Sequence, residues 1–407
     1  KNKDYTQNDT VGKAGMEQYY ETYLRGKNGE RKFYIDNVGR ISEIISSTDS
    51  VAGDDLYLSI DADLQKATYL ALQNEIAAIV YSNIKSGEIP INDVYTALIG
   101  NSVINTEHFS KAKASDTEKN VLSVFKSRQK TTLGKIKQEL TSSPEALNTM
   151  SDEVLDEFTY IISMLKDDQV LLKNEIDTSD SVYQKWKNQK ISPKEYLSYC
   201  ITQHWIDISQ LNVDEKYADS TEVYDALCKY ILKNIKTDTE FSKIIYQYMI
   251  TRGEISPRQL CLILFDQGVL DYDDATVNKL KNGSLSPRDF LMKKIYNIEI
   301  TPAQLALEPC TGSCVVTDEK TGEILAMVSY PGYDSNKLAN GVDSEYFASL
   351  QHDKSSPLLN YATQQKTAPG STFKLVSATA GLAENVITTS DQIRCTGIYN
   401  DISNKPK

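Results

Sequence analysis

Apolar side chains recur with different periods along the 407-residue chain, and the period predicts the kind of element. A helix is expected at Met16–Leu24 and an extended segment around Lys32–Asp36. Further on, Leu56, Leu58 and Ile60 occupy alternate positions, which predicts a half-buried strand. The first part of the chain therefore mixes helical and extended segments.

A long helix and then a wholly helical zone are expected after this strand. Asp61 is placed to cap a helix over Ala62–Ile79. The apolar positions of that helix are Leu64, Ala67, Ala71 and Leu72. Residues 80–297 then show an almost continuous helical pattern.

A hydroxyl residue followed by proline recurs in this zone and predicts helix starts. Proline suits the first helical position, where its missing N–H is not needed. The hydroxyl and the side chain three residues later can satisfy free backbone N–H groups, as in a capping box. The four copies start at Ser192, Ser256, Ser286 and Thr301. Because they are 64, 30 and 15 residues apart, we interpret them as helix starts rather than solenoid repeats.

The last zone changes to a strand pattern. Apolar runs at Cys314–Thr317 and Ile324–Val328 flank the turn-forming residues Asp318–Gly322, which predicts a hairpin. A second apolar helix is expected to begin at Ser371 and to continue through Leu382. We therefore predict an α+β, multidomain chain with boundaries at residues 1–79, 80–299 and 300–407.

Net charge excludes one class of partner. The chain has 56 acidic and 44 basic residues, a formal charge of −12. Nucleic-acid binding depends on clustered Lys and Arg that neutralise phosphates. No domain is therefore predicted to bind nucleic acid.

Cysteine and histidine usage argues against a metal site. The chain has three histidines and six cysteines, and no cysteine pair has the C-x-x-C spacing of zinc sites. Neither a metal nor another cofactor is predicted. Cys310 and Cys314 could form a disulfide in an exported protein, or could be two small residues at a strand edge.

Membrane-spanning and targeting signals are missing from the sequence as given. It has no apolar run of about 18 residues and no signal peptide. It begins in a polar segment without an initiator methionine, so we expect an excised piece of a longer protein.

Ser371 and Lys374 form the strongest candidate for chemistry. A serine three residues before a lysine on a helix places the hydroxyl and amine one turn apart, so a neutral amine could act as base. The spacing alone is not specific. Five further copies lie in the charged helical zone: Ser82/Lys85, Ser110/Lys113, Ser123/Lys126, Ser127/Lys130 and Ser163/Lys166. Only Ser371 follows a Pro-Gly turn and opens an apolar helix face.

Motifs from two separated regions resemble the class B penicillin-binding proteins. The first region contains G-K-A-G-M-E-Q-Y-Y-E-T-Y-L-R-G-K-N-G and D-L-Y-L-S-I-D-A-D-L-Q-K, which resemble the amino-terminal pedestal of that family. The second contains I-T-P-A-Q-L-A-L-E-P-C-T-G-S, V-V-T-D-E-K-T-G-E-I-L-A-M-V-S-Y-P-G-Y-D and A-P-G-S-T-F-K, which resemble the opening of its transpeptidase domain. The resemblance implies a partial pedestal over residues 1–79, a large all-α insertion, and the first part of a penicillin-binding, β-lactamase-like transpeptidase domain.

This resemblance implies a serine acyltransferase. In the family, the serine attacks the penultimate D-alanine carbonyl of a peptidoglycan stem peptide, and β-lactam antibiotics acylate the same serine. Carried over to this chain, Ser371 is the nucleophile and Lys374 its base. The implied activity is D,D-transpeptidation in cell-wall synthesis, at the extracellular face of the cell membrane, with an anchor upstream of Lys1.

The sequence also departs from the family. Its S-x-N and K-T/S-G elements do not occur after Ser371, so we expect the chain to be truncated and inactive by itself. The helical insertion resembles those in penicillin-binding proteins of anaerobic Gram-positive bacteria, and we interpret it as a docking or spacing domain for cell-wall assembly proteins. A D,D-carboxypeptidase and a non-catalytic scaffold remain alternatives. Relatives often have a second cysteine downstream of the one matching Cys395, which implies a possible partner beyond Lys407.

Overall fold

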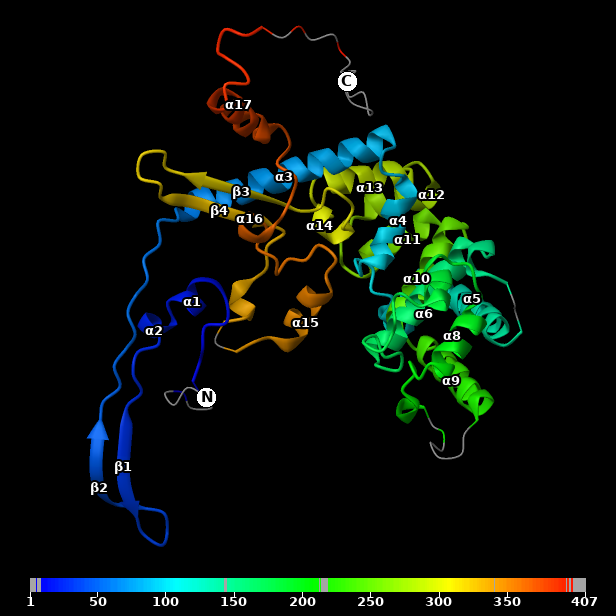
Figure 1. The fold of residues 1–407 in the computed structure, drawn as a ribbon, viewed down its shortest axis with the longest axis horizontal. Helices are drawn as coiled ribbons and strands as arrows, with labels where there is room; N and C mark the ends of the chain where they lie inside the picture. Colours follow the sequence, from blue (N-terminus) through cyan, green and yellow to red (C-terminus); the bar gives the residue numbers. More distant parts are fainter. Residues whose placement is uncertain are drawn as a thin grey trace. The chain divides into compact units, whose positions relative to one another are not determined.

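A computed structural model of the chain describes residues 5, 9–142, 145–211, 213, 219–339, 341–392, 394 and 397 (Figure 1). The chain divides into two compact units, residues 1–362 and 363–407, and each is described by itself. The described residues form many helices and two separate two-stranded sheets. This content agrees with the predicted α+β class.

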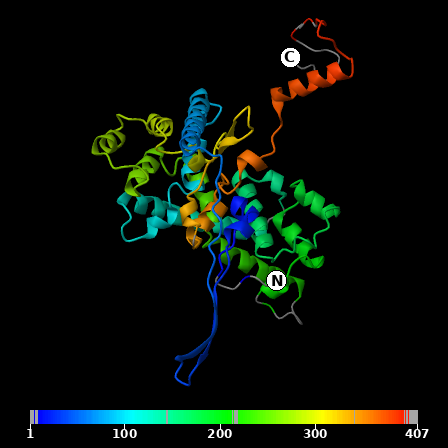
Figure 2. The same ribbon diagram turned by 90° about the vertical axis from the view of Figure 1, so that its left-hand side faces the viewer.

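The N-terminal elements confirm part of the predicted pattern. The expected helix is divided into α1 (Gly15–Tyr19) and α2 (Glu21–Leu24), because Tyr20 leaves helical geometry with φ −101° and ψ 16°. The predicted extended segment is β1 (Glu30–Ile35), and it pairs antiparallel with β2 (Ile41–Thr48), which the sequence did not predict. Every residue of this hairpin is exposed, and Figure 2 shows the two strands together.

The predicted half-buried strand at Leu56–Ile60 is wrong. No strand is formed there, and Leu56 and Leu58 are 37% and 53% exposed. Alternating apolar residues need a neighbouring strand to hold them in a sheet, and none of the described strands pairs with this segment. The chain instead reaches the second hairpin, where the Asp61 N–H donates to the Leu325 carbonyl at 2.9 Å.

The second hairpin packs on the long helix that follows. That helix is α3 (Ala62–Ser86), and the Asp61 carboxylate caps it by accepting from the Leu64 N–H at 2.8 Å, as predicted. The predicted hairpin is confirmed as β3 (Gly312–Thr317) and β4 (Ile324–Tyr330), paired antiparallel. Alternate β4 residues are buried on the α3 side: Ala326, Val328 and Tyr330. A side chain at Gly312 would meet Ile76 of α3 at 3.1 Å, so this glycine permits the close approach.

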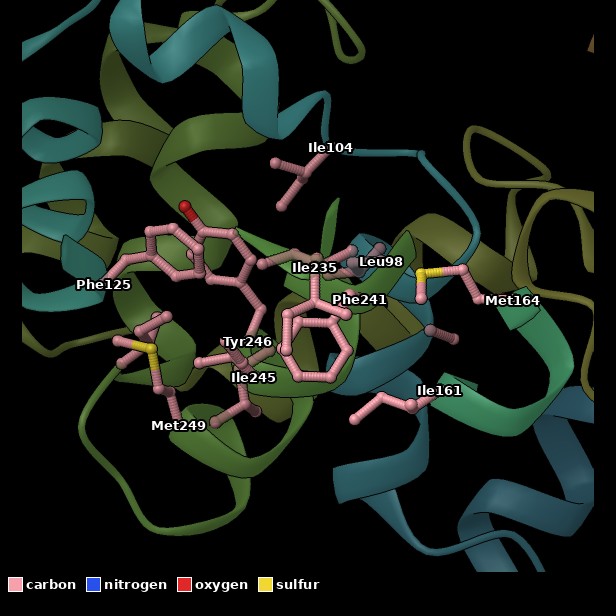
Figure 3. Close-up of a cluster of buried hydrophobic side chains, with 14 of the residues drawn as sticks. Leu98, Ile104, Phe125, Ile161, Met164, Ile235, Phe241, Ile245, Tyr246 and Met249 are labelled. Carbon is pink, nitrogen blue, oxygen red and sulfur yellow. The ribbon is translucent and has the colours of Figure 1, made fainter. Parts of the chain in front are cut away.

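The middle of the chain is helical, as predicted. Its α-helices are α4 (Ile91–Gly100), α5 (Asp116–Thr141), α6 (Asp152–Asp167), α7 (Ser181–Lys187), α8 (Pro193–Thr202), α9 (Ser220–Ile235), α10 (Thr239–Thr251), α11 (Pro257–Asp266), α12 (Asp274–Asn282) and α13 (Pro287–Tyr296). Short 3₁₀ turns lie at η1 (Thr106–Ser110), η2 (Leu147–Thr149) and η3 (Ile208–Gln210). Helix α10 packs against α4, α5 and α6, and its Tyr246 ring stacks on Phe125 of α5 with ring centroids 4.2 Å apart (Figure 3).

The predicted proline helix starts are confirmed. The side chains of Ser192, Ser256, Ser286 and Thr301 cap α8, α11, α13 and α14 (Pro302–Leu305), each with proline in the first turn. The capping box is complete at Ser256 and Thr301, where the glutamine three residues later reaches back to the backbone N–H.

Four of these short helices belong to one repeated local unit. In α4, α8, α11 and α13, each of 10 residues, the chain has positive φ before and after the helix. The two positive-φ residues are always 15 positions apart: Gly87 and Ser102, Gln189 and His204, Gly253 and Gly268, Gly283 and Ile298. An apolar residue lies two positions after each of them, and those after the helix are all buried: Ile104, Ile206, Leu270 and Ile300. The helical insertion thus contains four copies of a helix-and-turn unit, although its helix starts are unevenly spaced.

The remaining elements lead to the second unit. After β4 come η4 (Ser335–Lys337), α15 (Ser344–His352) and α16 (Tyr361–Gln364). The second unit contains η5 (Gly370–Thr372) and α17 (Phe373–Ala383). The predicted helix is therefore present, but it begins as a single 3₁₀ turn over Gly370–Thr372, which includes Ser371, and becomes α-helical only at Phe373.

Candidate active site

Ser371 lies in a tight turn whose geometry comes from its two predecessors. Pro369 has helical angles, φ −65° and ψ −16°, and Gly370 has φ +56°. Left-handed backbone of this kind favours glycine, because it carries no Cβ to clash with the following carbonyl. The Thr372 hydroxyl donates to the Pro369 carbonyl and closes the turn. The Pro-Gly pair thus brings the serine to the N-terminal end of α17.

Lys374 is the second residue of α17, three residues after Ser371. Both side chains are exposed within the unit of residues 363–407. The neighbouring apolar side chains are exposed as well: Phe373 by 52%, Leu375 by 77% and Val376 by 54%. This unit by itself does not supply the apolar surroundings that would favour a neutral lysine amine. The roles of Ser371 as nucleophile and Lys374 as base stay predictions.

The described cysteines form no disulfide. Cys310 is buried and Cys314 half-buried, and both are free thiols. Burial, together with the nearby Glu308 carboxylate, raises the pKa of Cys310 to about 11, so its thiol stays protonated at neutral pH. Cys395 lies outside the described residues.

The described ranges hold no group of three or more His, Cys, Asp or Glu side chains placed to bind a metal ion. None of their helices combines the length and apolar character needed to cross a bilayer.

Gln65 connects the start of α3 to β4, and sequence reasoning did not single it out. Its Nε2 donates to the Met327 carbonyl and its Oε1 accepts from the Met327 N–H, both at 2.7 Å. The side chain thereby takes the place of a neighbouring strand along the β4 edge. A glutamine on a helix has many surface roles, so no sequence signal distinguishes this one.

A hollow of about 440 Å³ lies beside this contact, between α3 and the segment after β4. Its lining includes Gln65, Tyr69, Ser329, Tyr333, Asp334 and Tyr346. None of the predicted site residues lies in it.

Two protein-family profiles match the chain. The penicillin binding protein transpeptidase domain matches residues 312–405, which include Ser371 and Lys374. The penicillin-binding protein dimerisation domain matches residues 1–58. The two matches lie on either side of the helical insertion.

Curated relatives are similar over short segments. The peptidoglycan D,D-transpeptidase PbpA of Mycolicibacterium smegmatis is 46% identical over 77 residues, which cover 18% of this chain and 16% of the relative. The peptidoglycan D,D-transpeptidase MrdA of Escherichia coli is 45% identical over 74 residues, 18% of this chain and 12% of the relative. MrdA of Acinetobacter baumannii is 31% identical over 112 residues, 28% of this chain and 16% of the relative. These matches therefore span less than a fifth of the length of each relative. No solved structure matches the chain significantly.

Proposed function

The chain belongs to the class B penicillin-binding protein family, and on that premise we propose that it is part of a peptidoglycan D,D-transpeptidase with Ser371 as its nucleophile. The observation that carries the proposal is the transpeptidase match over residues 312–405, because it contains the one S-x-x-K copy that follows a Pro-Gly turn. The names of the similar relatives agree with this activity.

In the proposed reaction, the Ser371 hydroxyl oxygen attacks the penultimate D-alanine carbonyl of a stem peptide. The hydroxyl proton passes to a base, and the peptide C–N bond then breaks, so that terminal D-alanine leaves with a proton on its nitrogen. An amine from a second strand attacks the resulting ester and restores the serine hydroxyl. A β-lactam would acylate Ser371 by the same first step.

Two local features support Ser371 in this role. It lies at the N-terminal end of α17, where free backbone N–H groups and the helix dipole favour developing negative charge on oxygen. Lys374 follows one turn later and is the nearest amine in the sequence, so we assign it the role of base.

The other regions fit roles around this reaction. We propose that the N-terminal region, including the hairpin β1–β2, is part of the pedestal, and that the helical insertion docks or spaces cell-wall assembly partners. Since stem peptides are cross-linked outside the cell, the proposed place of action is the extracellular face of the membrane.

Covalent labelling with a fluorescent penicillin tests the proposal. The full-length protein should become fluorescent on a denaturing gel, and the Ser371→Ala variant should not. Ser127→Ala is a matched control, because Ser127 also precedes a lysine by three residues but lies on the exposed surface of α5. Labelling that survives in Ser371→Ala, or that is absent from a folded wild-type protein, would refute the assignment.

A further inference from the structure

A strip of lysines runs along α5, the long helix of the insertion. Between Lys119 and Gln138 the helix has six basic residues and no acidic residue. Four of the six are separated by 7, 4 and 7 residues, or two, one and two helical turns, so they share one face. They are Lys119, Lys126, Lys130 and Lys137, all exposed, and we call them the lysine strip. At 1.5 Å per residue the strip is about 27 Å long.

The other two basic residues of α5, Arg128 and Lys135, lie on a different face of the helix, and Arg128 has a structural role. The Arg128 guanidinium donates to the buried carboxylate of Glu153 at 2.9 Å and lies 3.8 Å from Glu254. In contrast, none of the four strip lysines forms an ion pair with a described acidic residue. The strip is therefore a row of positive charges without ion-pair partners among the described residues, on a chain whose net charge is −12.

Neighbouring helices add to the positive charge. The Gln129 side chain donates to the Lys236 carbonyl at 3.0 Å, which brings the C-terminal end of α9 beside the middle of the strip. Lys236 and Lys233 are exposed there. At the other end of α5, the Lys194 amine donates to the Thr141 carbonyl at 2.7 Å. Figure 1 shows α5, α8 and α9 in one part of the insertion.

From this arrangement we propose that the lysine strip binds a linear phosphodiester polymer without aromatic bases. A row of charges on a straight helix matches a linear anion. Lysine is a flexible point charge, which suits a mobile polymer better than the fixed fork of arginine. The inference does not depend on the proposed transpeptidase activity.

The surroundings of the strip favour this ligand over two other anions. Exposed residues beside the lysines are small, such as Ser123, Ser127 and Gly134. Nucleic-acid single strands bind through aromatic side chains that stack on bases, and the one aromatic residue of α5, Phe125, is buried. A membrane surface would require exposed apolar side chains next to the lysines, and Leu122 and Leu133 are only half-exposed.

Titration with soluble poly(glycerol phosphate) tests the inference on the full chain. Binding should weaken steeply with salt, on the order of 50-fold between 50 and 200 mM, if about four phosphates are neutralised. The variant K119Q/K126Q/K130Q/K137Q should lose at least tenfold in affinity and most of this salt dependence. K126Q/K130Q should give an intermediate loss.

A control with the same net charge separates a specific strip from general attraction. K85Q/K173Q/K187Q/K320Q removes four exposed lysines from four separate segments. It should bind the polymer within about twofold of wild type. The proposal would be overturned by equal losses of affinity in the two quadruple variants or by no binding of the polymer to wild type. Tighter binding to single-stranded DNA or to phosphatidylglycerol vesicles than to the polymer would also overturn it. Circular dichroism should show the same helix content in all variants.

Discussion

The helical insertion buries its large apolar side chains, whereas the unit that carries Ser371 leaves such side chains exposed. In the insertion, large side chains such as Phe241, Phe158 and Tyr196 are completely buried, and helix starts are capped. In residues 363–407, the apolar residues Phe373 and Leu375 of α17 are more than half exposed. The insertion therefore provides its own core, whereas the unit that carries the candidate nucleophile leaves these apolar side chains exposed.

This difference in burial predicts that sequence changes in the two regions affect different measured properties. A region that closes its own core can act as a rigid spacer, and its sequence changes should appear as changes in stability. A region with exposed apolar side chains gains little stability from them, so changes there should appear in labelling or activity.

The largest expected difference is between two apolar truncations. Phe241→Ala should lower the free energy of unfolding of the helical insertion by about 3–5 kcal/mol, because it leaves a cavity among fully buried residues. Leu375→Ala should change it by no more than about 0.5 kcal/mol, because Leu375 is 77% exposed. Urea unfolding followed by circular dichroism measures both. Similar effects from the two variants would contradict the comparison.

A buried carboxyl group should make the stability of the insertion depend on pH. Glu157 is 1% exposed, and burial, with a smaller effect from the Glu153 charge, raises its pKa from 4.5 to about 8. The folded state then keeps a proton that the unfolded state releases above pH 4.5. Stability from this group is complete below pH 4.5 and is lost as the pH rises toward 8, by about 3 kcal/mol between pH 4.5 and 7.

Glu157→Gln should remove this pH dependence, because the amide stays neutral in both states. The measurement is the difference in unfolding free energy between wild type and variant at pH 5 and pH 7. Glu175→Gln, at an exposed position, serves as the control and should leave the dependence as in wild type. If the unfolding free energy of Glu157→Gln depends on pH as in wild type, groups other than Glu157 cause that dependence.

The smallest expected effect concerns a helix cap. The Ser256 hydroxyl accepts from the Gln259 N–H at 3.3 Å and completes a capping box at α11. Ser256→Ala should lower the free energy of unfolding by about 1 kcal/mol. Ser256→Asp should lower the free energy of unfolding by less, since a carboxylate can also cap the helix. Equal losses in the two variants would indicate that packing around Ser256 matters more than the cap.

Sequence reasoning succeeded where a local chemical rule determines the structure. The Asp61 cap, the proline helix starts and the hairpin at Asp318–Gly322 all depend on residues next to one another. It failed at Leu56–Ile60, because alternation shows which side chains could share a face but not whether a partner strand exists.

The repeated unit of the insertion was hidden for a different reason. Its left-handed positions are glycine at Gly87 and Gly253 but also Gln189, His204 and Ile298, which give no compositional signal. Similarly, S-x-x-K gave the spacing of Ser371 and Lys374 but not the 3₁₀ turn at the serine. The surroundings of Lys374 depend on contacts that no local pattern contains.

Mass spectrometry that locates the acyl group identifies the nucleophile. The full-length protein would be treated with benzylpenicillin, digested and fragmented, so that the modified residue is identified. We expect the mass of one penicilloyl group on Ser371. Acylation of any other serine, with Ser371 unmodified in a folded protein, would contradict this expectation.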